Sequence, residues 1–287
     1  MRPDKLNSLI FLDGGDPEET RRAIDLLGFL DGQTTNPTLI SRHPDAKERF
    51  ERGEKFSEQE LLDFYRDVVE ELSTLIPDGS ISIEVYADKE TKAEQMLDWG
   101  RDMNGWIPNA HVKFPTTYEG LKAAEQAVKE GIRVNMTLCF SQEQAAAVYA
   151  ATKGARQGDV YVSPFIGRLD DIGQNGMDLI KNVIRMYGGG DEHMKVLTAS
   201  VRELDHVLEA VRLESDIITC PFKLIEKWAD RNLEMPGPDF SYSPSGLDPI
   251  EFKTMGLEKD WRAYDISHHK TDEGMEKFSK DWNNLIK

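Results

Sequence analysis

Short apolar runs alternate along the chain with longer segments in which apolar residues recur at helical spacing. Eight runs rich in β-branched or apolar residues predict strands, at residues 8–13, 32–37, 80–86, 110–115, 133–140, 159–165, 194–200 and 216–222. Helix-like segments rich in Glu, Lys, Ala and Leu lie between them, for example at residues 17–30, 119–131, 141–155 and 200–215. Eight strands with intervening helices are what a (β/α)₈ barrel, the TIM barrel of the α/β class, requires.

Several of the predicted strands are apolar almost throughout. This pattern fits a parallel sheet covered on both sides, since an antiparallel sheet with one wet face would alternate polar and apolar residues. A doubly wound open sheet is the alternative architecture. The length of 287 residues would suit one large barrel or two ordinary domains, and the regular alternation favours a single barrel domain over residues 1–287.

The alternation stops after the last predicted strand. Residues 230–260 form an irregular insertion, and within it residues 236–249 are rich in Pro, Gly and Ser, which predicts a loop. Residues 271–286 then begin with Thr-Asp and carry apolar residues at helical spacing, namely Met275, Phe278, Trp282 and Leu285. We expect an additional C-terminal helix there, packed on the barrel.

The net charge of −17 makes nucleic acid an unsuitable partner, because phosphate neutralisation needs clustered Lys and Arg. If the ligand is a small anion, the positive charge that binds it must gather in one pocket. No apolar stretch approaches the roughly 18 residues of a spanning helix, so we expect a cytoplasmic protein without a membrane partner.

Cys139 and Cys220 lie in separate apolar runs and are expected to be reduced core thiols. The six histidines show no metal-ligand spacing, and we predict no metal site.

Each predicted strand ends in polar or ionisable residues. These are Asp13, Thr35 with Asn36, Glu84, Lys113, Thr137, Ser163 followed by Arg168, Ser200 followed by Arg202, and Thr219. One polar residue at a strand end is most often a turn or cap residue. In a β/α barrel, however, these positions converge on the carboxyl-terminal mouth, where active sites of this architecture lie. The sequence therefore predicts a polar site at the mouth.

Lys113 lies between Val112 and Phe114 inside an apolar strand. A lysine there loses hydration, which favours the neutral amine that can attack a carbonyl and form a Schiff base. The alternative is a structural role, with the ammonium group in a buried salt bridge to Glu84 or Asp13. The two interpretations share their geometry and differ in reactivity.

Other strand-end residues can supply the remaining parts of such a site. The carboxylates Asp13 and Glu84 are candidates for proton transfer in a Schiff-base mechanism. Arg168 and Arg202 each follow a strand-end serine. The hydroxyls, the following helix N-termini and the two guanidinium groups together predict a clamp for phosphate.

Six stretches, in collinear order, resemble the transaldolase family of class I, Schiff-base aldolases. They are "TTNPTLI" (34–40), "SIEV" (82–85), "VKFPTTYEGLKA" (112–123), "NMTLCFS" (135–141), "SPFIGRLDD" (163–171) and "LTASVRE" (197–203). The resemblance runs from about residue 8 to about residue 228 and returns weakly in "EGMEKFSKDW". The combination of "TTNP" with a lysine strand followed by "PTTYEGLKA" is highly specific.

The resemblance implies a barrel whose fourth strand carries the Schiff-base lysine, here Lys113. Such an enzyme moves a dihydroxyacetone unit from a ketose phosphate to an aldose phosphate, without metal or organic cofactor, in the pentose phosphate pathway. By similarity, Asp13 takes the proton of the C4 hydroxyl as the C3–C4 bond breaks, while Glu84 and Thr137 handle the water of the imine steps. The substrate-binding positions of the family fall on Thr35, Asn36, Ser163, Phe165, Arg168, Ser200 and Arg202. Asn36 and Ser163 would hold the dihydroxyacetone part, and the last three residues match the phosphate positions. The partners implied are sugar phosphates, with a homo-oligomer left open.

The chain also departs from the family pattern. Gly14 stands where a threonine often follows the first-strand aspartate, Thr38 replaces the usual serine of "TTNPS", and residues from about 230 to 260 have no match. One alternative function is a fructose-6-phosphate aldolase-like lyase, which releases free dihydroxyacetone; its pattern has glutamine and tyrosine where this chain has Glu84 and Phe165. Another is a transaldolase for a sulfo-sugar or other anionic sugar, and a third is a catalytically silent sugar-phosphate sensor. The intact Lys113, Asp13 and Glu84 favour an enzyme over the sensor.

Overall fold

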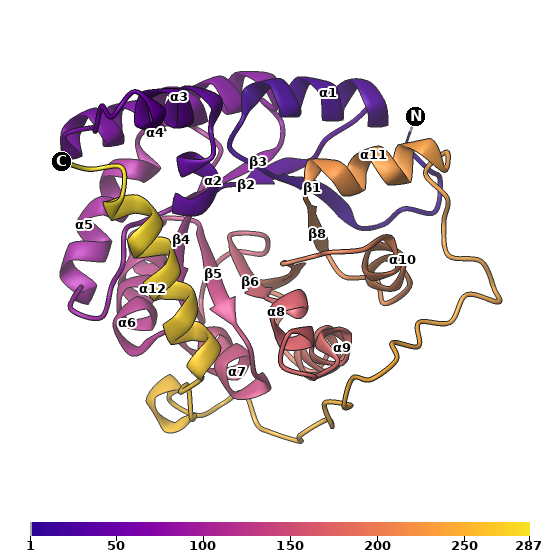
Figure 1. Cartoon of the computed structure of the whole chain (residues 1–287). Helices are drawn as coiled ribbons and strands as arrows, with labels where there is room; N and C mark the ends of the chain where they lie inside the picture. The colour runs from indigo at the N-terminus through magenta and orange to yellow at the C-terminus, as the bar shows by residue number, and fades with distance from the viewer. Residues whose placement is uncertain (1) are drawn as a thin grey trace.

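Eight parallel strands close into a barrel in the computed structural model, which describes residues 2–287 (Figure 1). The strands are β1 Leu9–Asp13, β2 Gly32–Thr34, β3 Ser80–Glu84, β4 Ala110–Pro115, β5 Val134–Cys139, β6 Val160–Pro164, β7 Met194–Thr198 and β8 Ile217–Cys220. Each strand pairs with its neighbours in sequence, and β8 pairs with β1. The prediction of a (β/α)₈ barrel is confirmed at all eight positions, and the open-sheet alternative is wrong.

The continuous apolarity of the strands follows from their place in the molecule. Every residue of β3, β4, β5, β6 and β8 is buried. Successive side chains of a strand point to opposite faces, so one set fills the barrel interior and the other packs under the surrounding helices. The polar residues at the strand ends are therefore brought together at one end of a packed barrel rather than around an open pore.

The helices surround this barrel. They are α1 Pro17–Leu27, α2 Pro37–Ser41, α3 Pro44–Glu51, α4 Glu58–Leu75, α5 Ala93–Asn104, α6 Tyr118–Lys129, α7 Gln142–Ala151, α8 Ile166–Asp170, α9 Gly176–Tyr187, α10 Leu204–Arg212, α11 Phe222–Asp230 and α12 His269–Asn283. Helix α1 ends earlier than the predicted residue 30 because Gly28 adopts a left-handed conformation, with φ of 74°. Within residues 2–287, no helix is long and apolar enough to cross a membrane.

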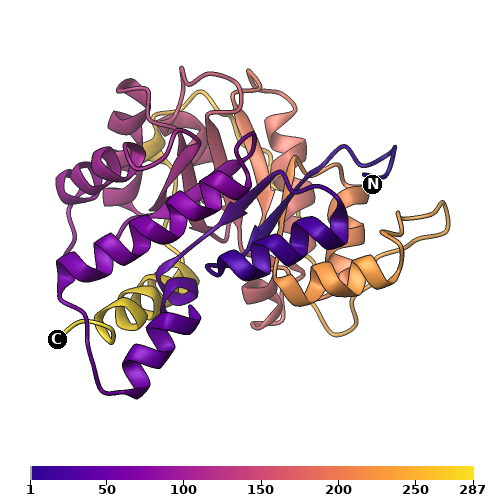
Figure 2. The same cartoon turned by 90° about the horizontal axis from the view of Figure 1, so that it is seen from above.

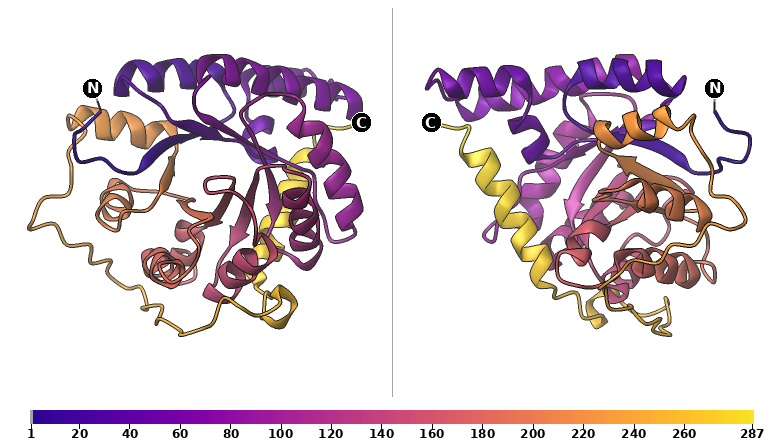
Figure 3. Two further views of the ribbon diagram at one scale, coloured as in Figure 1. Left: turned by 180° about the vertical axis from the view of Figure 1, so that it is seen from behind. Right: turned by 45° about the vertical axis from the view of Figure 1, so that its right-hand side comes forward.

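A long irregular segment, which we call the strap (residues 231–268), connects α11 to α12. It includes the short 3-10 helix η1, Trp261–Ala263. Figure 3 shows the strap passing outside the helices that follow β6 and β7 before it reaches α12. The loop predicted at residues 236–249 is confirmed as irregular.

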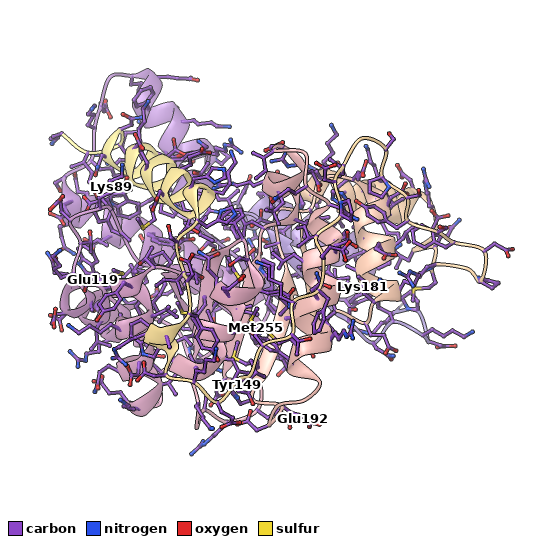
Figure 4. The ribbon with its side chains drawn as sticks, turned by 90° about the horizontal axis from the view of Figure 1, so that it is seen from below. Lys89, Glu119, Tyr149, Lys181, Glu192 and Met255 are labelled. Carbon is purple, nitrogen blue, oxygen red and sulfur yellow. The ribbon has the colours of Figure 1, made fainter. Side chains whose placement is uncertain are left out.

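Polar contacts hold the strap against the outer helices. Asn182 of α9 donates a hydrogen bond to the Ile250 carbonyl oxygen at 2.7 Å. Figure 4 shows Met255 of the strap between Tyr149 of α7 and Lys181 of α9. The strap therefore follows the outer surface of the barrel, and its path determines where α12 begins.

Helix α12 lies beside α2 and reaches the carboxyl-terminal mouth (Figure 2). It begins two residues before the predicted start at Thr271, because His268 caps the helix through the Lys270 N–H. The Thr271 hydroxyl instead donates to the Leu138 carbonyl oxygen at 3.0 Å and accepts from the Gln144 side chain at 2.8 Å. These contacts fix the helix to the end of β5.

Candidate active site

The carboxyl ends of the strands surround a cavity of about 180 Å³. Its lining consists of Asp13, Thr34, Asn36, Thr38, Leu39, Arg42, Lys113, Thr137, Ser163, Phe165, Arg168, Leu197, Ala199, Ser200, Thr219, Lys277 and Phe278. Most of the strand-end residues predicted to converge at the mouth are in this set. Thr35, Glu84 and Arg202 are predicted site residues that do not line the cavity.

Lys113 lies on β4 with its side chain 4% exposed. Its Nζ atom donates to the Thr35 carbonyl oxygen at 2.8 Å and lies 2.9 Å from Oε2 of Glu84, on the adjacent strand β3. The buried ion pair that either interpretation of this lysine predicts is thus present. Lys113 also lines the cavity, so its amine is accessible to a small molecule there. A purely structural ion pair would not need this access.

Two buried oxygens beside the lysine have unused hydrogen-bonding capacity. Apart from the Lys113 ion pair, Oε2 of Glu84 has no partner with hydrogen-bond geometry within residues 2–287, and the same holds for the Thr137 hydroxyl. Burial raises the pKa of Glu84, while the Lys113 charge lowers it in part. Unpaired buried polar groups are rare and call for an explanation. A water or substrate hydroxyl bound beside either oxygen would supply the missing partner.

Asp13 ends β1 and lines the cavity. The Thr34 hydroxyl donates to its Oδ1 at 2.8 Å. Burial raises the pKa of Asp13, and Lys113, the Thr34 hydrogen bond, Arg168 and, last, Arg42 lower it in part. A carboxylate with a raised pKa is a stronger base than a free one, which suits it to accept a proton and to return it.

Asn36 and Ser163 line the cavity from opposite strands of the barrel. Oδ1 of Asn36 caps α2 by accepting from the Leu39 N–H at 2.9 Å, which leaves the amide NH₂ available. The Ser163 hydroxyl donates to Oδ1 of Asn135 at 2.6 Å. Asn135 is a polar residue of β5 that pairs in register with Lys113, and the sequence interpretation missed it. The sequence feature that could have identified Asn135 is a single amide side chain within an apolar run.

Arg168 follows β6 and lines the cavity with its guanidinium group between two aromatic rings. Its Cζ lies 5.2 Å from the ring centroid of Phe165 and 5.2 Å from that of Phe278 on α12. Burial lowers the pKa of Arg168. Within the described chain it forms no salt bridge, so its charge is available to an anion.

Ser200 and Arg202 follow β7, and the structure places them differently. Ser200 lines the cavity and adopts a left-handed backbone, with φ of 59°. Arg202 forms a bidentate pair with Asp171 and has a side chain 46% exposed. The predicted clamp of two arginines is therefore half assembled, with Arg168 in the cavity and Arg202 outside its lining.

The position of Thr35 follows from strand geometry. Its hydroxyl donates to the Ser82 carbonyl oxygen at 2.7 Å and bonds the Tyr65 hydroxyl at 2.5 Å, outside the barrel interior. Only its carbonyl oxygen reaches the site, as the acceptor for Lys113.

Among the basic and aromatic lining residues of the described chain, three were not predicted as site residues. Arg42 follows α2, and Lys277 and Phe278 come from α12. The basic lining residues in the described chain are Arg42, Lys113, Arg168 and Lys277, against Asp13 as the acidic one. In a chain of net charge −17, the cavity is locally positive, as the sequence argument for an anionic ligand required.

Neither cysteine lines the cavity. Cys139 and Cys220 are free and buried, and burial raises the pKa of each thiol to about 12. No group of three His, Cys, Asp or Glu side chains in the described chain is arranged to hold a metal ion.

Comparison with known proteins places the chain in a family. It matches the family described as transaldolase/fructose-6-phosphate aldolase over residues 10–287. A probable transaldolase from Roseiflexus sp. (strain RS-1) is 39% identical over 218 residues, covering 76% of this chain and 88% of that protein. One from Anaeromyxobacter sp. (strain Fw109-5) is 40% identical over 227 residues, covering 79% and 92%.

A probable transaldolase from Thermoplasma volcanium is 33% identical over 273 residues, covering 95% of this chain and 94% of that protein. Among solved structures, KGPDC from Streptococcus mutans has a TM-score of 0.43 and 16% identity over 78% of this chain and 98% of that one. The family match and the curated relatives both span most of the chain. The chain therefore belongs to the transaldolase and fructose-6-phosphate aldolase family.

Proposed function

We propose that the protein is a transaldolase that moves a dihydroxyacetone unit from a ketose phosphate to an aldose phosphate through a Schiff base on Lys113. The observation that carries this proposal is the position of Lys113, whose buried amine opens into a cavity with four basic lining residues and one acidic one among the described residues. Family membership makes an aldolase-type or transferase-type enzyme the expected class.

The residues support each proton transfer that the reaction needs. The Lys113 amine, after passing a proton to Glu84 at 2.9 Å, attacks the C2 carbonyl of the donor, and the resulting carbinolamine loses water to give the imine. Glu84 and Thr137 are the candidates to bind that water, because within residues 2–287 the Thr137 hydroxyl has no hydrogen-bond partner and Oε2 of Glu84 has no partner besides Lys113.

Asp13 is the base for the carbon–carbon cleavage. It accepts the C4 hydroxyl proton while the electrons of the C3–C4 bond move into the enamine, and the aldose leaves. When an acceptor aldose enters, the enamine attacks its carbonyl carbon and Asp13 returns the proton to the new hydroxyl. Water then hydrolyses the imine and releases the lengthened ketose. The raised pKa of Asp13 suits both directions.

The locally positive cavity supports phosphorylated sugars as substrates. Arg168 and Ser200 line it on the β6 and β7 side, where a phosphate would gain charge-assisted hydrogen bonds. A cytoplasmic role in the pentose phosphate pathway, and a homo-oligomeric state, are carried over from the family resemblance as part of this proposal.

Trapping of the imine tests the proposal. Borohydride treatment in the presence of fructose 6-phosphate should add the mass of the reduced donor to the peptide that carries Lys113. Lys113→Ala should abolish the adduct, and Lys122→Ala, at an exposed lysine of the next helix, should keep it. An adduct on another lysine would disprove the assignment.

The environment of the enamine distinguishes the proposed transaldolase from the lyase alternative. Phe165 lines the cavity and has no hydroxyl that could hold a water near the enamine. The enamine should therefore survive until an aldose arrives. Adding erythrose 4-phosphate should accelerate donor consumption at least about tenfold, which is about 1.4 kcal/mol of barrier. Phe165→Tyr should raise acceptor-independent release, and equal wild-type rates with and without acceptor would favour the lyase.

A further inference from the structure

Two basic residues of the cavity have no part in the mechanism above. Arg42 follows α2, and Lys277 lies on α12. We propose that Arg42 and Lys277 join Arg168 as ligands of the substrate's anionic group, so that α12 selects phosphorylated over unphosphorylated sugars. This inference rests on the proposed function for its substrate class, and it assigns the anion site to three elements far apart in sequence.

One face of α12 is directed at Arg168. Gly274, Lys277 and Phe278 are spaced by three and four residues, which places them on the same side of a helix. A Cβ atom on Gly274 would lie 2.7 Å from Nη1 of Arg168, so the helix backbone approaches the guanidinium group closely. The Phe278 ring lies 5.2 Å from the same group. Lys277, between these two contacts, therefore faces the same part of the cavity.

Lys277 is also held in place at the cavity mouth. Its Nζ lies 2.8 Å from Oδ2 of Asp281, one helical turn further along α12. The same oxygen accepts a hydrogen bond from the Thr38 hydroxyl on α2. Lys277 is 51% exposed, so its ammonium group can turn from Asp281 toward an anion without unfolding any element.

Arg42 has the features of an available anion ligand. Its guanidinium group forms no hydrogen bond or salt bridge to the rest of the described chain, although it lines the cavity. Arg202, in contrast, is already paired with Asp171 outside the lining. Arg42 follows β2 and Arg168 follows β6, which are four strands apart in a closed barrel of eight. Arg42 nevertheless follows α2, which packs against α12 and its Lys277, and all three basic side chains line one cavity.

The charge arrangement explains why an anion should bind. Lys113 is compensated by Glu84, and Lys277 is only partly compensated by Asp281. Among residues 2–287, no carboxylate pairs with Arg168 or Arg42 in the same small cavity. A tetrahedral dianion would relieve the repulsion among Arg42, Arg168 and Lys277. It would also form charge-assisted hydrogen bonds with these three side chains. The ligand class is therefore a phosphate or sulfonate on the sugar chain.

Inorganic phosphate is the probe that tests this inference. Its affinity would be measured by calorimetry with the wild-type protein and with Arg42→Gln and Lys277→Gln, which remove charge from partly exposed positions. We expect each substitution to weaken phosphate binding at least about fivefold, as loss of a charge-assisted contact implies. Lys280→Gln is the matched control, because Lys280 is an exposed lysine on α12 outside the cavity lining.

The same variants give a kinetic readout. Arg42→Gln and Lys277→Gln should lower kcat/KM for fructose 6-phosphate by a larger factor than kcat/KM for unphosphorylated fructose, whereas Lys280→Gln should change neither. Wild-type phosphate affinity in either variant, or an equal loss in Lys280→Gln, would overturn the inference. Phosphate binding needs no turnover, so it decides this inference even if borohydride trapping at Lys113 fails and the proposed function falls.

Discussion

The floor and the rim of the cavity are built in different ways. On the floor, strand residues are buried or half-buried and paired with neighbouring strands, as in the Lys113–Glu84 ion pair and the Thr34–Asp13 hydrogen bond. On the rim, Arg42, Arg168 and Lys277 come from positions after β2, after β6 and on α12. Rim charges have few carboxylate partners in the described chain, whereas the floor has a partner for each charge.

Under the proposed function, this difference separates two tasks. Bond making needs groups fixed within tenths of an ångström, and burial on a barrel provides that rigidity. Anion selection needs exposed positive charge that can adjust to substrates of different length. The following substitutions test whether floor and rim divide chemistry and selection in this way.

The largest effect is expected for Lys113→Ala. Loss of the nucleophile should lower kcat at least about 10³-fold, which is about 4 kcal/mol. The variant also leaves Glu84 buried without its ion-pair partner, and breaking such a pair typically costs about 3–5 kcal/mol of unfolding free energy. Steady-state assays measure the loss of kcat, and urea unfolding measures the loss of unfolding free energy.

A double variant controls for that loss of stability. Lys113→Met with Glu84→Leu removes both charges, and replacing a buried pair by apolar groups is often neutral. It should regain most of the stability and none of the activity. If the double variant were as unstable as Lys113→Ala, the ion pair would not explain the loss.

Asp13→Asn should reduce activity and increase stability. Removing a general base typically costs about 10²–10⁴-fold in rate. Because burial raises the folded-state pKa of Asp13 above its unfolded value, the wild-type carboxyl group favours folding at low pH, and this contribution is lost as pH rises through the raised pKa. At neutral pH the variant should therefore have the higher melting temperature, and the gain should shrink as pH falls. A gain independent of pH would contradict this account.

Most of the floor could be predicted from the sequence because its candidate residues lie within an apolar run or directly after one. Thr35 is an exception, because its side chain lies outside the cavity. Strand alternation explains this, since Thr34 and Asn36 point into the barrel while Thr35 points toward Tyr65. A prediction that names a strand end without its register cannot separate these neighbours. The family resemblance supplied residue roles, which periodicity alone does not give.

The rim could not be predicted in the same way. Lys277 lies in an ordinary amphipathic helix, and its place at the mouth depends on the path of the strap over residues 231–268, which has no repeating pattern. Arg42 lies several residues beyond the end of β2. The pairing of Arg202 with Asp171 joins two loops, and loop contacts of this kind leave no periodic signal.

Gly274→Ala tests the contact between α12 and the rim. The added Cβ would lie 2.5 Å from Cδ2 of Leu138 and 2.7 Å from Nη1 of Arg168. Overpacking typically costs about 1–3 kcal/mol, and alanine returns about 0.5–1 kcal/mol in helix propensity. We expect a small loss of stability together with a higher KM for fructose 6-phosphate. Gly256→Ala, at a position with open space around it, should change neither quantity.

The smallest effect is expected for Arg202→Ala, compared with Arg168→Ala. The Arg202–Asp171 pair is about half exposed on both sides, and exposed pairs contribute about 0–1 kcal/mol to stability. Arg202 lies outside the cavity lining, so its removal should raise the KM for fructose 6-phosphate less than removal of Arg168, which lines the cavity and has no carboxylate partner within residues 2–287. Steady-state assays of both variants, with unphosphorylated fructose as the control donor, measure the difference. If Arg202→Ala raised this KM as much as Arg168→Ala, Arg202 would have to leave Asp171 when substrate binds. Arg202 would then be a fourth cation of the rim, and it would be paired with Asp171 only in the absence of substrate.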